Sequence, residues 1–379
     1  MSSKAKAKGG NAFSRALKRI GESSCVQAFS RLLKRIGEST CVQAFLRVIK
    51  RIWESKFIRV VRRVVKYTWG NYSIIVVCVL LFLIIGFIEP RFLRIDNLMH
   101  ILRNSSFVGI IALGMTFVII TGGIDLSAGH VLAVSGSTLI LVQNIEAFYP
   151  GVAVPLALAI SLCILISVFI GMLNGVIITT FKLPPFIVTL AIGIIARAIA
   201  KFVLDGATVR GRFIEEMAMI GRGSIFGINY SVIVWLVMAV ILGCVLKYTR
   251  FGTNIYAVGG NENAARYSGI AVNKTKIIAY TLTGLCIGIA ALFDVSRMAA
   301  VNAATSGELY EFDAITAVVV GGTALAGGRG RILGTVFGAV MITAVVGNVM
   351  VMLGISSYLA GLIKGTIILV AVLLQRRDK

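Results

Sequence analysis

Long apolar runs, separated by short polar stretches, dominate the chain from residue 71 onward. Most of these runs are about 17 to 25 residues long, enough for a helix to cross a hydrocarbon layer of about 30 Å. Without water in that layer a segment must satisfy its own backbone hydrogen bonds, so helices are expected rather than open sheets. We predict an all-α, polytopic membrane helical bundle with about ten transmembrane helices, at residues 72–89, 106–121, 130–148, 153–179, 186–204, 231–247, 277–296, 314–328, 332–353 and 357–375.

The longest polar interruption, KYTRFGTNIYAVGGNENAARYSGI, runs from Lys247 to Ile270. Gly260 is expected in a turn, Asn261 is a good helix N-cap, and Glu262 falls in the first turn, where the helix dipole favours an anion. The helix formers that follow, and the glycine expected to end the helix in the left-handed conformation, are Ala264, Ala265, Arg266 and Gly269. The pattern predicts a short, well-capped helix outside the membrane, although the spacing fits an ordinary surface loop equally well.

A glycine-rich break, GGIDLS at 122–127, separates two apolar runs. Asp125 has two interpretations: it lies beside a transport pathway, because carboxylates near hydrocarbon face cavities or partners, or it caps the following helix. Residues 118–136 also resemble residues 318–338, and paired glycine breaks of this kind often flank the pathway of a transporter. The candidate pathway residues are Gly122, Gly123, Asp125, Ser127, Asn174, Gly321 and Gly322.

Several further polar residues lie in or near the apolar runs. Asp294 and Arg297 are three positions apart on one helix face and can form an ion pair. We expect most of the others to form interhelical hydrogen bonds or to lie at span ends, among them Arg197 and Asn348.

Charge is unevenly distributed in a chain that is 58% hydrophobic and only 14% charged. Residues 1–66 hold 17 Lys and Arg against 3 Glu, so this segment contributes +14 of the net +22. Such a basic segment predicts a cytoplasmic N-terminus, although the arginines Arg91, Arg94, Arg103, Arg210 and Arg212 then fall outside, against the positive-inside tendency. We divide the chain into an extension, 1–70, and a transmembrane domain, 71–379.

The extension carries three copies of a 16-residue repeat over residues 12–59, the first being AFSRALKRIGESSCVQ. Each copy has apolar positions at helical spacing with Lys and Arg beside them, which favours short amphipathic helices on an anionic membrane surface. Charge alone would also allow nucleic-acid binding, but the adjacent membrane spans make this the less favoured interpretation. A tandem duplication with little function is the remaining alternative.

Motifs of catalysis and metal binding are missing from the sequence. It contains no GxxxxGK[ST] phosphate loop and no grouping of nucleophile, base and metal ligands. We therefore expect a transport subunit rather than an enzyme, with no catalytic residues and no metal site.

Four segments resemble the permease subunits of ribose- and galactose-type ABC importers. They are GMTFVIITGGIDLSAGHVLAVSG at 114–136, KLPPFIVTLAIGIIARAIA at 182–200, FGTNIYAVGGNENAARYSGI at 251–270 and YEFDAITAVVVGGTALAGGRGRILGTVFGAVMI at 310–342. The resemblance covers most of residues 100–375 and leaves the basic extension unexplained.

The resemblance implies a permease that moves a monosaccharide across a bacterial inner membrane, with multiple passes and both termini cytoplasmic. It further implies a cytoplasmic coupling loop at about 248–276 that binds a separate ATPase subunit, which holds ATP and Mg²⁺. The other implied partners are an extracytoplasmic sugar-binding protein, a second permease, identical or not, and membrane lipid, but no nucleic acid. A nucleoside or a signalling sugar is an alternative substrate. An ion-coupled secondary transporter is disfavoured by the shortage of carboxylates in the spans, and a membrane scaffold would not need the coupling loop.

Overall fold

The computed structural model describes residues 78–148 and 154–352, with short pieces at 359, 361–362, 365–366 and 369. The basic extension 1–70 and most of the expected last span, 357–375, lie outside the described residues. Their predicted organisation stays a prediction.

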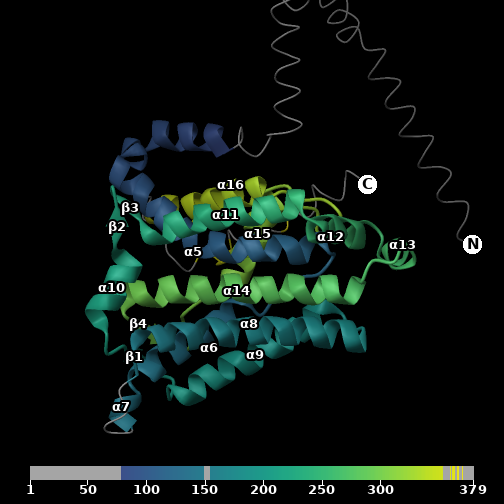
Figure 1. The fold of residues 1–379 in the computed structure, drawn as a ribbon. Coiled ribbons are helices and arrows are strands. Elements are labelled where there is room, and N and C mark those ends of the chain that lie inside the picture. Colours follow the sequence, from purple (N-terminus) through teal and green to yellow (C-terminus); the bar gives the residue numbers. More distant parts are fainter. Residues whose placement is uncertain are drawn as a thin grey trace, which may run out of the picture. The chain divides into compact units, whose positions relative to one another are not determined.

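The described part is a helical bundle with very little strand, which confirms the predicted all-α class (Figure 1). Within the described residues, six helices are long and apolar enough to cross a membrane. They are α5 (Ile95–Ile120), α8 (Leu156–Phe181), α9 (Pro185–Val203), α11 (Tyr230–Tyr248), α14 (Val272–Met298) and the continuous helix Ile332–Val349. The last comprises α16 (Ile332–Ile342) and the π-helix η2 (Thr343–Val349), and α17 (Met350–Met352) continues it. Shorter helices are Cys78–Ile88, η1 (Pro90–Leu93), α6 (Ala128–Gln143), α7 (Ile145–Phe148), α10 (Ile214–Arg222), α12 (Arg250–Gly260), α13 (Glu262–Tyr267) and α15 (Tyr310–Val320).

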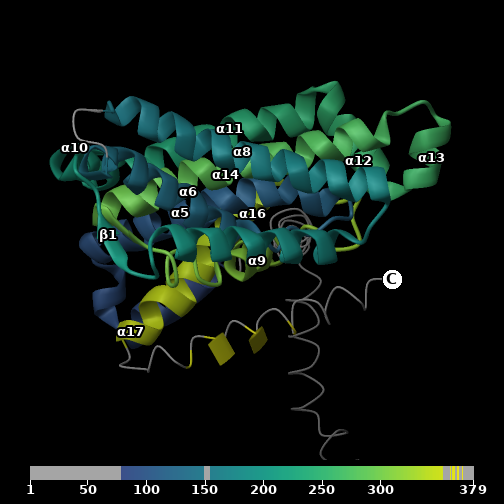
Figure 2. The same ribbon diagram turned by 90° about the horizontal axis from the view of Figure 1, so that it is seen from below.

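The bundle has two ends of different construction (Figures 1 and 2). At one end stand α12 and α13, in the connection between α11 and α14. At the other end lie α7, α10 and two small antiparallel pairs of strands. These pair β1 (Thr208–Arg210) with β4 (Ala300–Asn302), and β2 (Ser224–Ile225) with β3 (Ile228–Asn229). We call them the α13 end and the strand end.

Three predicted spans differ clearly from the structure. The expected span 130–148 is divided at Asn144 into α6 and α7. The expected span 106–121 is the second part of α5, which begins at Ile95, because the polar stretch before it continues the helix instead of forming a loop. Asn97 explains part of this: its amide donates to the Phe92 carbonyl at 2.8 Å and accepts from Asn348 on η2. The polar residues therefore join helices where the sequence suggested a connection.

The expected span 314–328 was also wrong in its bounds, because α15 ends at Val320. Eleven residues at 1.5 Å each make a helix of about 16 Å, roughly half the hydrocarbon thickness. Gly322 follows with φ +89°, a conformation that stops the helix, and residues 321–331 form an irregular connection to α16. One of the membrane segments is therefore a half-length helix.

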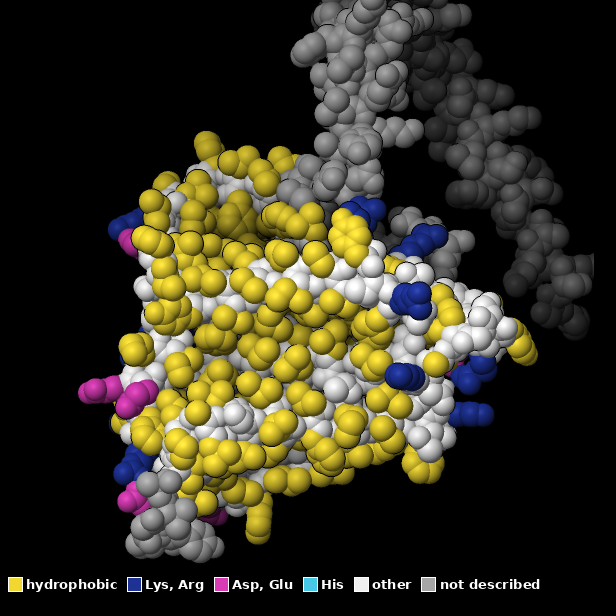
Figure 3. Space-filling view, in the orientation of Figure 1, with side chains coloured by type: hydrophobic (Ala, Val, Ile, Leu, Met, Phe, Trp, Pro, Cys, Tyr) yellow, Lys and Arg dark blue, Asp and Glu magenta, His cyan; other side chains and the backbone are white. Residues whose placement is uncertain are grey.

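Apolar side chains cover the flank of the bundle, and charged side chains gather toward its ends (Figure 3). Large hydrophobic side chains on this part of the chain are widely exposed, for example Phe202 at 88% and Phe87 at 91%. In water this exposure would be unfavourable, whereas in a bilayer the hydrocarbon solvates these side chains. The surface therefore supports the predicted membrane location.

Helices α8 and α14 pack backbone to backbone through facing glycines. Gly171 and Gly175 on α8, and Gly284 and Gly288 on α14, each form a G-x-x-x-G pair. A Cβ added to Gly171 or Gly284 would overlap a backbone carbonyl of the facing helix. Because lipid is as apolar as the side chains, close packing of this kind is a main source of helix association in membranes.

Replacing Gly284 by alanine is therefore expected to destabilise the bundle. The added methyl overlaps the Ser167 carbonyl oxygen, and such overpacking costs about 1–3 kcal/mol. Gly243→Ala on α11 is the matched control, because its nearest neighbour would be Ile332 at an ordinary 3.9 Å. Thermal unfolding in detergent should show a lower Tm for Gly284→Ala only; equal shifts in both variants would contradict this account of α8 and α14.

Candidate coupling element and pathway segments

Helix α13 is capped at both ends as its sequence predicts. The Asn261 side chain accepts a hydrogen bond from the Ala264 N–H at 2.9 Å, which satisfies one free donor of the first turn. At the other end Gly269 has φ +80°, and the Ile270 and Gly269 N–H groups donate to the carbonyls of Ala265 and Arg266. This is a Schellman ending, so the N-cap and the helix-ending glycine are both confirmed.

The residues before Asn261 form a second helix, where the sequence predicted a turn. Gly260 is the last residue of α12, and Asn261 alone separates α12 from α13. Thr249 caps α12 by accepting from the Gly252 N–H at 3.2 Å. Its buried residues, Gly252, Ile255 and Val258, recur at helical spacing, and this periodicity was the signal available in the sequence.

Ala265 points into the protein and is only 4% exposed. It packs with Val258 of α12 and Val272 of α14 in a small apolar cluster. Ala265 therefore packs α13 against α12 and α14, and it is not part of the outward surface that a partner would contact.

Glu262 joins α13 to α14. Its carboxylate accepts from Lys276 Nζ at 2.6 Å and from Arg266 Nη2 at 3.2 Å. The hydrogen bond from Lys276 is the main cause that lowers the Glu262 pKa, with Arg266 adding to it and partial burial opposing it. At neutral pH the carboxylate is therefore charged and holds two cations of the same segment.

The outward surface of α13 carries a residue that our sequence analysis did not select. The Tyr267 side chain is 91% exposed on the last turn of α13, and Arg266 beside it is half-exposed. Aromatic residues and arginine are enriched at the centres of protein interfaces. The position of Tyr267 in a short polar helix between two spans was the only indication of this role in the sequence.

Three of the predicted pathway residues meet near the start of α6. Asp125 Oδ1 accepts from the Ser127 N–H at 2.9 Å and from Ser127 Oγ at 2.6 Å. Asn174 of α8 donates to Ser127 Oγ at 3.0 Å, and all three side chains are fully buried. The Asp125 carboxylate binds a backbone N–H before the helix begins, but Ser127 occupies the N-cap position, so the interpretation of Asp125 as the N-cap was wrong. A role in the pathway stays a prediction.

The two glycine breaks are alike in their backbone geometry. Gly122 after α5 and Gly322 after α15 have φ +82° and +89°, and each is followed by an N–H that reaches back to a carbonyl five residues earlier. Both are Schellman endings. The structure therefore pairs Gly122 with Gly322, one position away from our matching of Gly122-Gly123 with Gly321-Gly322. Gly321 instead allows close contact between α15 and Gly334 of α16.

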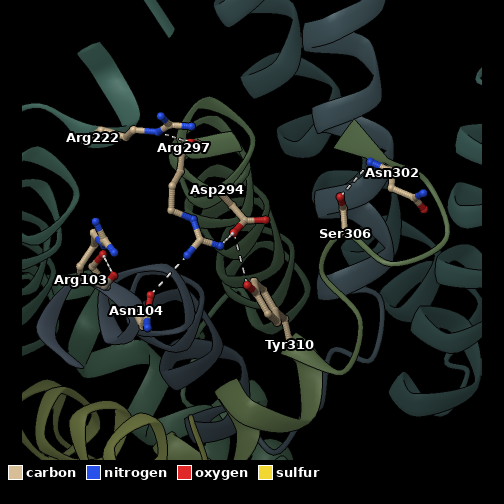
Figure 4. A network of polar contacts seen from close by, with 9 residues as sticks. Arg103, Asn104, Arg222, Asp294, Arg297, Asn302, Ser306 and Tyr310 are labelled. Atoms are coloured by element: carbon tan, nitrogen blue, oxygen red, sulfur yellow. Dashed lines mark hydrogen bonds and ion pairs between the residues drawn. The ribbon is translucent and has the colours of Figure 1, made fainter. Parts of the chain in front are cut away.

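The predicted pair of Asp294 and Arg297 forms near the end of α14 that faces the strand end, within a larger network (Figure 4). Arg297 Nη2 lies 3.4 Å from Asp294 Oδ1, and its other amino group donates to Asn104 of α5. Tyr310, the first residue of α15, donates to the same Asp294 oxygen at 3.3 Å. The network ties α5, α14 and α15 together.

Arg197 holds the segment that leads into α15. Its guanidinium donates to the carbonyls of Ala303, Ala304 and Ser306 at 2.9, 3.3 and 2.7 Å, and to that of Gly129 on α6 at 3.2 Å. These contacts confirm that this intramembrane arginine makes interhelical hydrogen bonds. Sequence alone could not show that its partners are backbone carbonyls of an irregular segment.

The fold and these elements define a class: a multi-pass helical membrane protein with a capped helix pair between two spans. The chain belongs to the permease family described as the branched-chain amino acid transport system / permease component, which it matches over residues 97–372.

Relatives of the chain include ribose import permeases. That of Bacillus subtilis is 42% identical over 299 residues, 79% of this chain and 90% of the relative, and that of Haemophilus influenzae is 39% identical over 301 residues with the same coverage. The galactose/methyl galactoside import permease of Escherichia coli is 36% identical over 316 residues, 80% of this chain and 93% of the relative. No solved structure matches the chain.

Proposed function

We propose that this chain is the membrane permease of an ATP-driven importer that moves a monosaccharide of the ribose or galactose kind across a bacterial inner membrane. The observation that carries the proposal is the similarity, over about four fifths of the chain, to permeases named for ribose and galactose import. A separate subunit binds ATP and Mg²⁺, and a sugar-binding protein delivers the substrate. A second permease, identical or not, completes the pathway.

The α12–α13 pair is the proposed contact for the ATPase. It stands at one end of the bundle, it is fixed by caps, by an apolar cluster and by the Glu262 ion pairs, and it exposes Tyr267. A rigid element is suited to carry force, because a flexible loop would absorb the movement of its partner. ATP binding in the partner would move this pair and switch the pathway from one side of the membrane to the other.

This assignment makes the α13 end cytoplasmic and the strand end extracytoplasmic. The positive-inside tendency is then opposed by arginines at the strand end. Three of them have a carboxylate within ion-pair distance: Arg91 with Glu89, Arg94 with Asp96 and Arg212 with Glu146. The basic segment 1–66 supports the same orientation, which places both termini in the cytoplasm.

Extraction from native membranes in mild detergent tests the proposal. A stoichiometric ATPase subunit should accompany the chain, and proteoliposomes containing the complex and its binding protein should take up ribose or galactose only with ATP inside. A nucleoside and leucine belong in the same assay, because the family description names amino acid transport. Recovery of the chain alone, with uptake driven by an ion gradient, would contradict the proposal.

Tyr267→Ala should weaken the binding of the ATPase. Loss of a central aromatic contact costs about 2 kcal/mol or more at a protein interface, which is more than tenfold in affinity. Tyr248→Ala is the matched control, since Tyr248 is also exposed, at 73%, but lies at the end of α11. Titration of the purified ATPase onto each permease variant measures the effect; equal affinities for the two variants would exclude Tyr267 from the contact.

A further inference from the structure

Three segments that are far apart in sequence meet at the α13 end, and each contributes backbone rather than side chains. They are the end of α5 at Ile120 and Gly122, the end of α12 at Gly259, and the irregular connection at Gly327 and Gly328. The Gly328 N–H donates to the Ile120 carbonyl at 2.8 Å, so the end of α5, next to the first glycine break, is hydrogen-bonded to the connection 321–331, which contains the second break. We call these five residues the glycine joint.

Gly259 closes this joint from the side of α12. A Cβ added to Gly259 would overlap the Ile120 carbonyl oxygen and lie 2.6 Å from the Gly328 nitrogen. A Cβ added to Gly327 would lie 2.9 Å from the Gly259 carbonyl oxygen and 3.0 Å from the Gly122 nitrogen. The three backbones therefore touch, with no side chain between them to absorb a displacement.

Helix α12 is also fixed to the second break by one side chain. The Tyr256 hydroxyl donates to the Gly330 carbonyl at 2.7 Å. On its other side α12 is joined to α13 through Asn261 and through the apolar cluster of Val258, Ala265 and Val272. A movement of α13 thus has a short route, through α12, to both glycine breaks.

We propose that Gly259 is a positioning residue through which movement of α12 reaches both glycine breaks together. This inference rests on the proposed function, in which an ATPase moves α13. The first break leads into the buried cluster of Asp125, Ser127 and Asn174, and the second leads from α15 into α16. The segments that contain both breaks contact the same α12 backbone. Both breaks, and the parts of the pathway beside them, therefore change conformation at the same time.

A glycine of α11 provides the control variant. Gly259→Ala places its methyl in the joint, whereas a Cβ at Gly243, outside the proposed ATPase contact, has its nearest neighbour, Ile332, at an ordinary 3.9 Å. Both substitutions replace a helical glycine by alanine, so a loss seen only in Gly259→Ala reports on the joint. Tyr256→Phe is the milder variant: it keeps the ring and removes only the hydrogen bond to Gly330.

The experiment uses the complete complex with its ATPase and binding protein in proteoliposomes, and measures sugar uptake per ATP hydrolysed. Gly259→Ala should retain the ATPase in normal amount but lose about tenfold or more of this ratio, as expected when a coupling free energy is removed. Gly243→Ala should stay within about twofold of the wild type, and Tyr256→Phe should fall between them. A normal ratio for Gly259→Ala, or an equal loss for Gly243→Ala, would overturn the proposal.

Hydrogen exchange provides a second readout. When ATP is added, the hydrogen exchange rates of peptides covering residues 119–127 and 322–331 should change together in the wild type and in Gly243→Ala, and no longer together in Gly259→Ala. If Gly259→Ala fails to fold, Tyr256→Phe decides, and wild-type behaviour of Tyr256→Phe in both assays overturns the proposal. A wild-type complex that hydrolyses ATP without moving any tested sugar would contradict the proposed function alone. The role of the glycine joint would still be tested by the hydrogen exchange of the two peptides.

Discussion

Arg197→Leu should abolish uptake and strongly destabilise the described bundle. The guanidinium makes four hydrogen bonds to carbonyls, three of them in the irregular segment before α15. Hydrogen bonds to charged groups contribute about 1.5–3 kcal/mol each, and the partly buried carbonyls of Ala303, Ser306 and Gly129 would be left without this donor. We expect a loss of several kcal/mol, so the segment leading into α15 should no longer hold one conformation.

The control for this variant lies one turn further along α9. Lys201→Leu removes a positive charge from the same helix at an exposed position and should leave uptake and Tm nearly unchanged. Arg197→Lys should lower uptake and Tm by as much as Arg197→Leu or somewhat less, because a single ammonium group cannot donate to all four acceptors as the guanidinium does. Uptake per inserted permease and Tm in detergent measure both effects; wild-type uptake in Arg197→Leu would show that these hydrogen bonds do not support transport.

Glu262→Lys should abolish uptake while leaving the spans inserted. The substitution places a third cation beside Arg266 and Lys276, in the first turn of a helix whose dipole disfavours positive charge. Helix α13 should then lose its fixed position against α14, and ATPase recovered with the permease should fall below detection. Normal recovery of the ATPase would contradict both the positioning role of the Glu262 ion pairs and the proposed contact of α13 with the ATPase.

A charge swap distinguishes an ion pair that positions α13 within the permease from a direct contact of Glu262 with the ATPase. Glu262→Lys combined with Lys276→Glu restores an ion pair in the opposite sense and should recover part of the ATPase binding, whereas a direct contact would not recover. The pH dependence has a defined sign as well. The lowered pKa of Glu262 means that the ion pairs are present above the ordinary carboxyl range and are lost as pH falls through that lowered pKa. Binding that depends on them should therefore be constant from about pH 6 to about pH 8.

The candidate coupling element was predictable where local chemistry decides the structure. The N-cap of Asn261 and the left-handed Gly269 follow from side-chain and backbone preferences within α13. The same local reasoning placed Gly260 in a turn, and there it failed. The apolar spacing of Gly252, Ile255 and Val258 indicated a helix here, but its contacts with the distant connection, such as Tyr256 with Gly330, lie outside residues 247–270.

Packing also gives different roles to residues that the sequence had placed together in the coupling element. Ala265 and Glu262 were both expected at the contact with the ATPase, yet the buried methyl of Ala265 and the paired carboxylate of Glu262 hold α13 in place. Tyr267, which sequence reasoning passed over, exposes 91% of its surface on the last turn of α13. Composition cannot separate these roles, because the direction of a side chain on a short helix depends on which neighbours cover it.

By itself the sequence determined the membrane bundle and most of its spans, because hydrophobicity and length act locally and require no knowledge of neighbours. It also determined the caps of α13 and the presence of two glycine breaks. Only the tertiary structure decided that α15 is a half-length helix, that Arg197 holds the segment before it, and that the two breaks meet α12. These features depend on contacts between residues up to about two hundred positions apart, such as Gly328 with Ile120, where the donor and acceptor are backbone groups common to every residue.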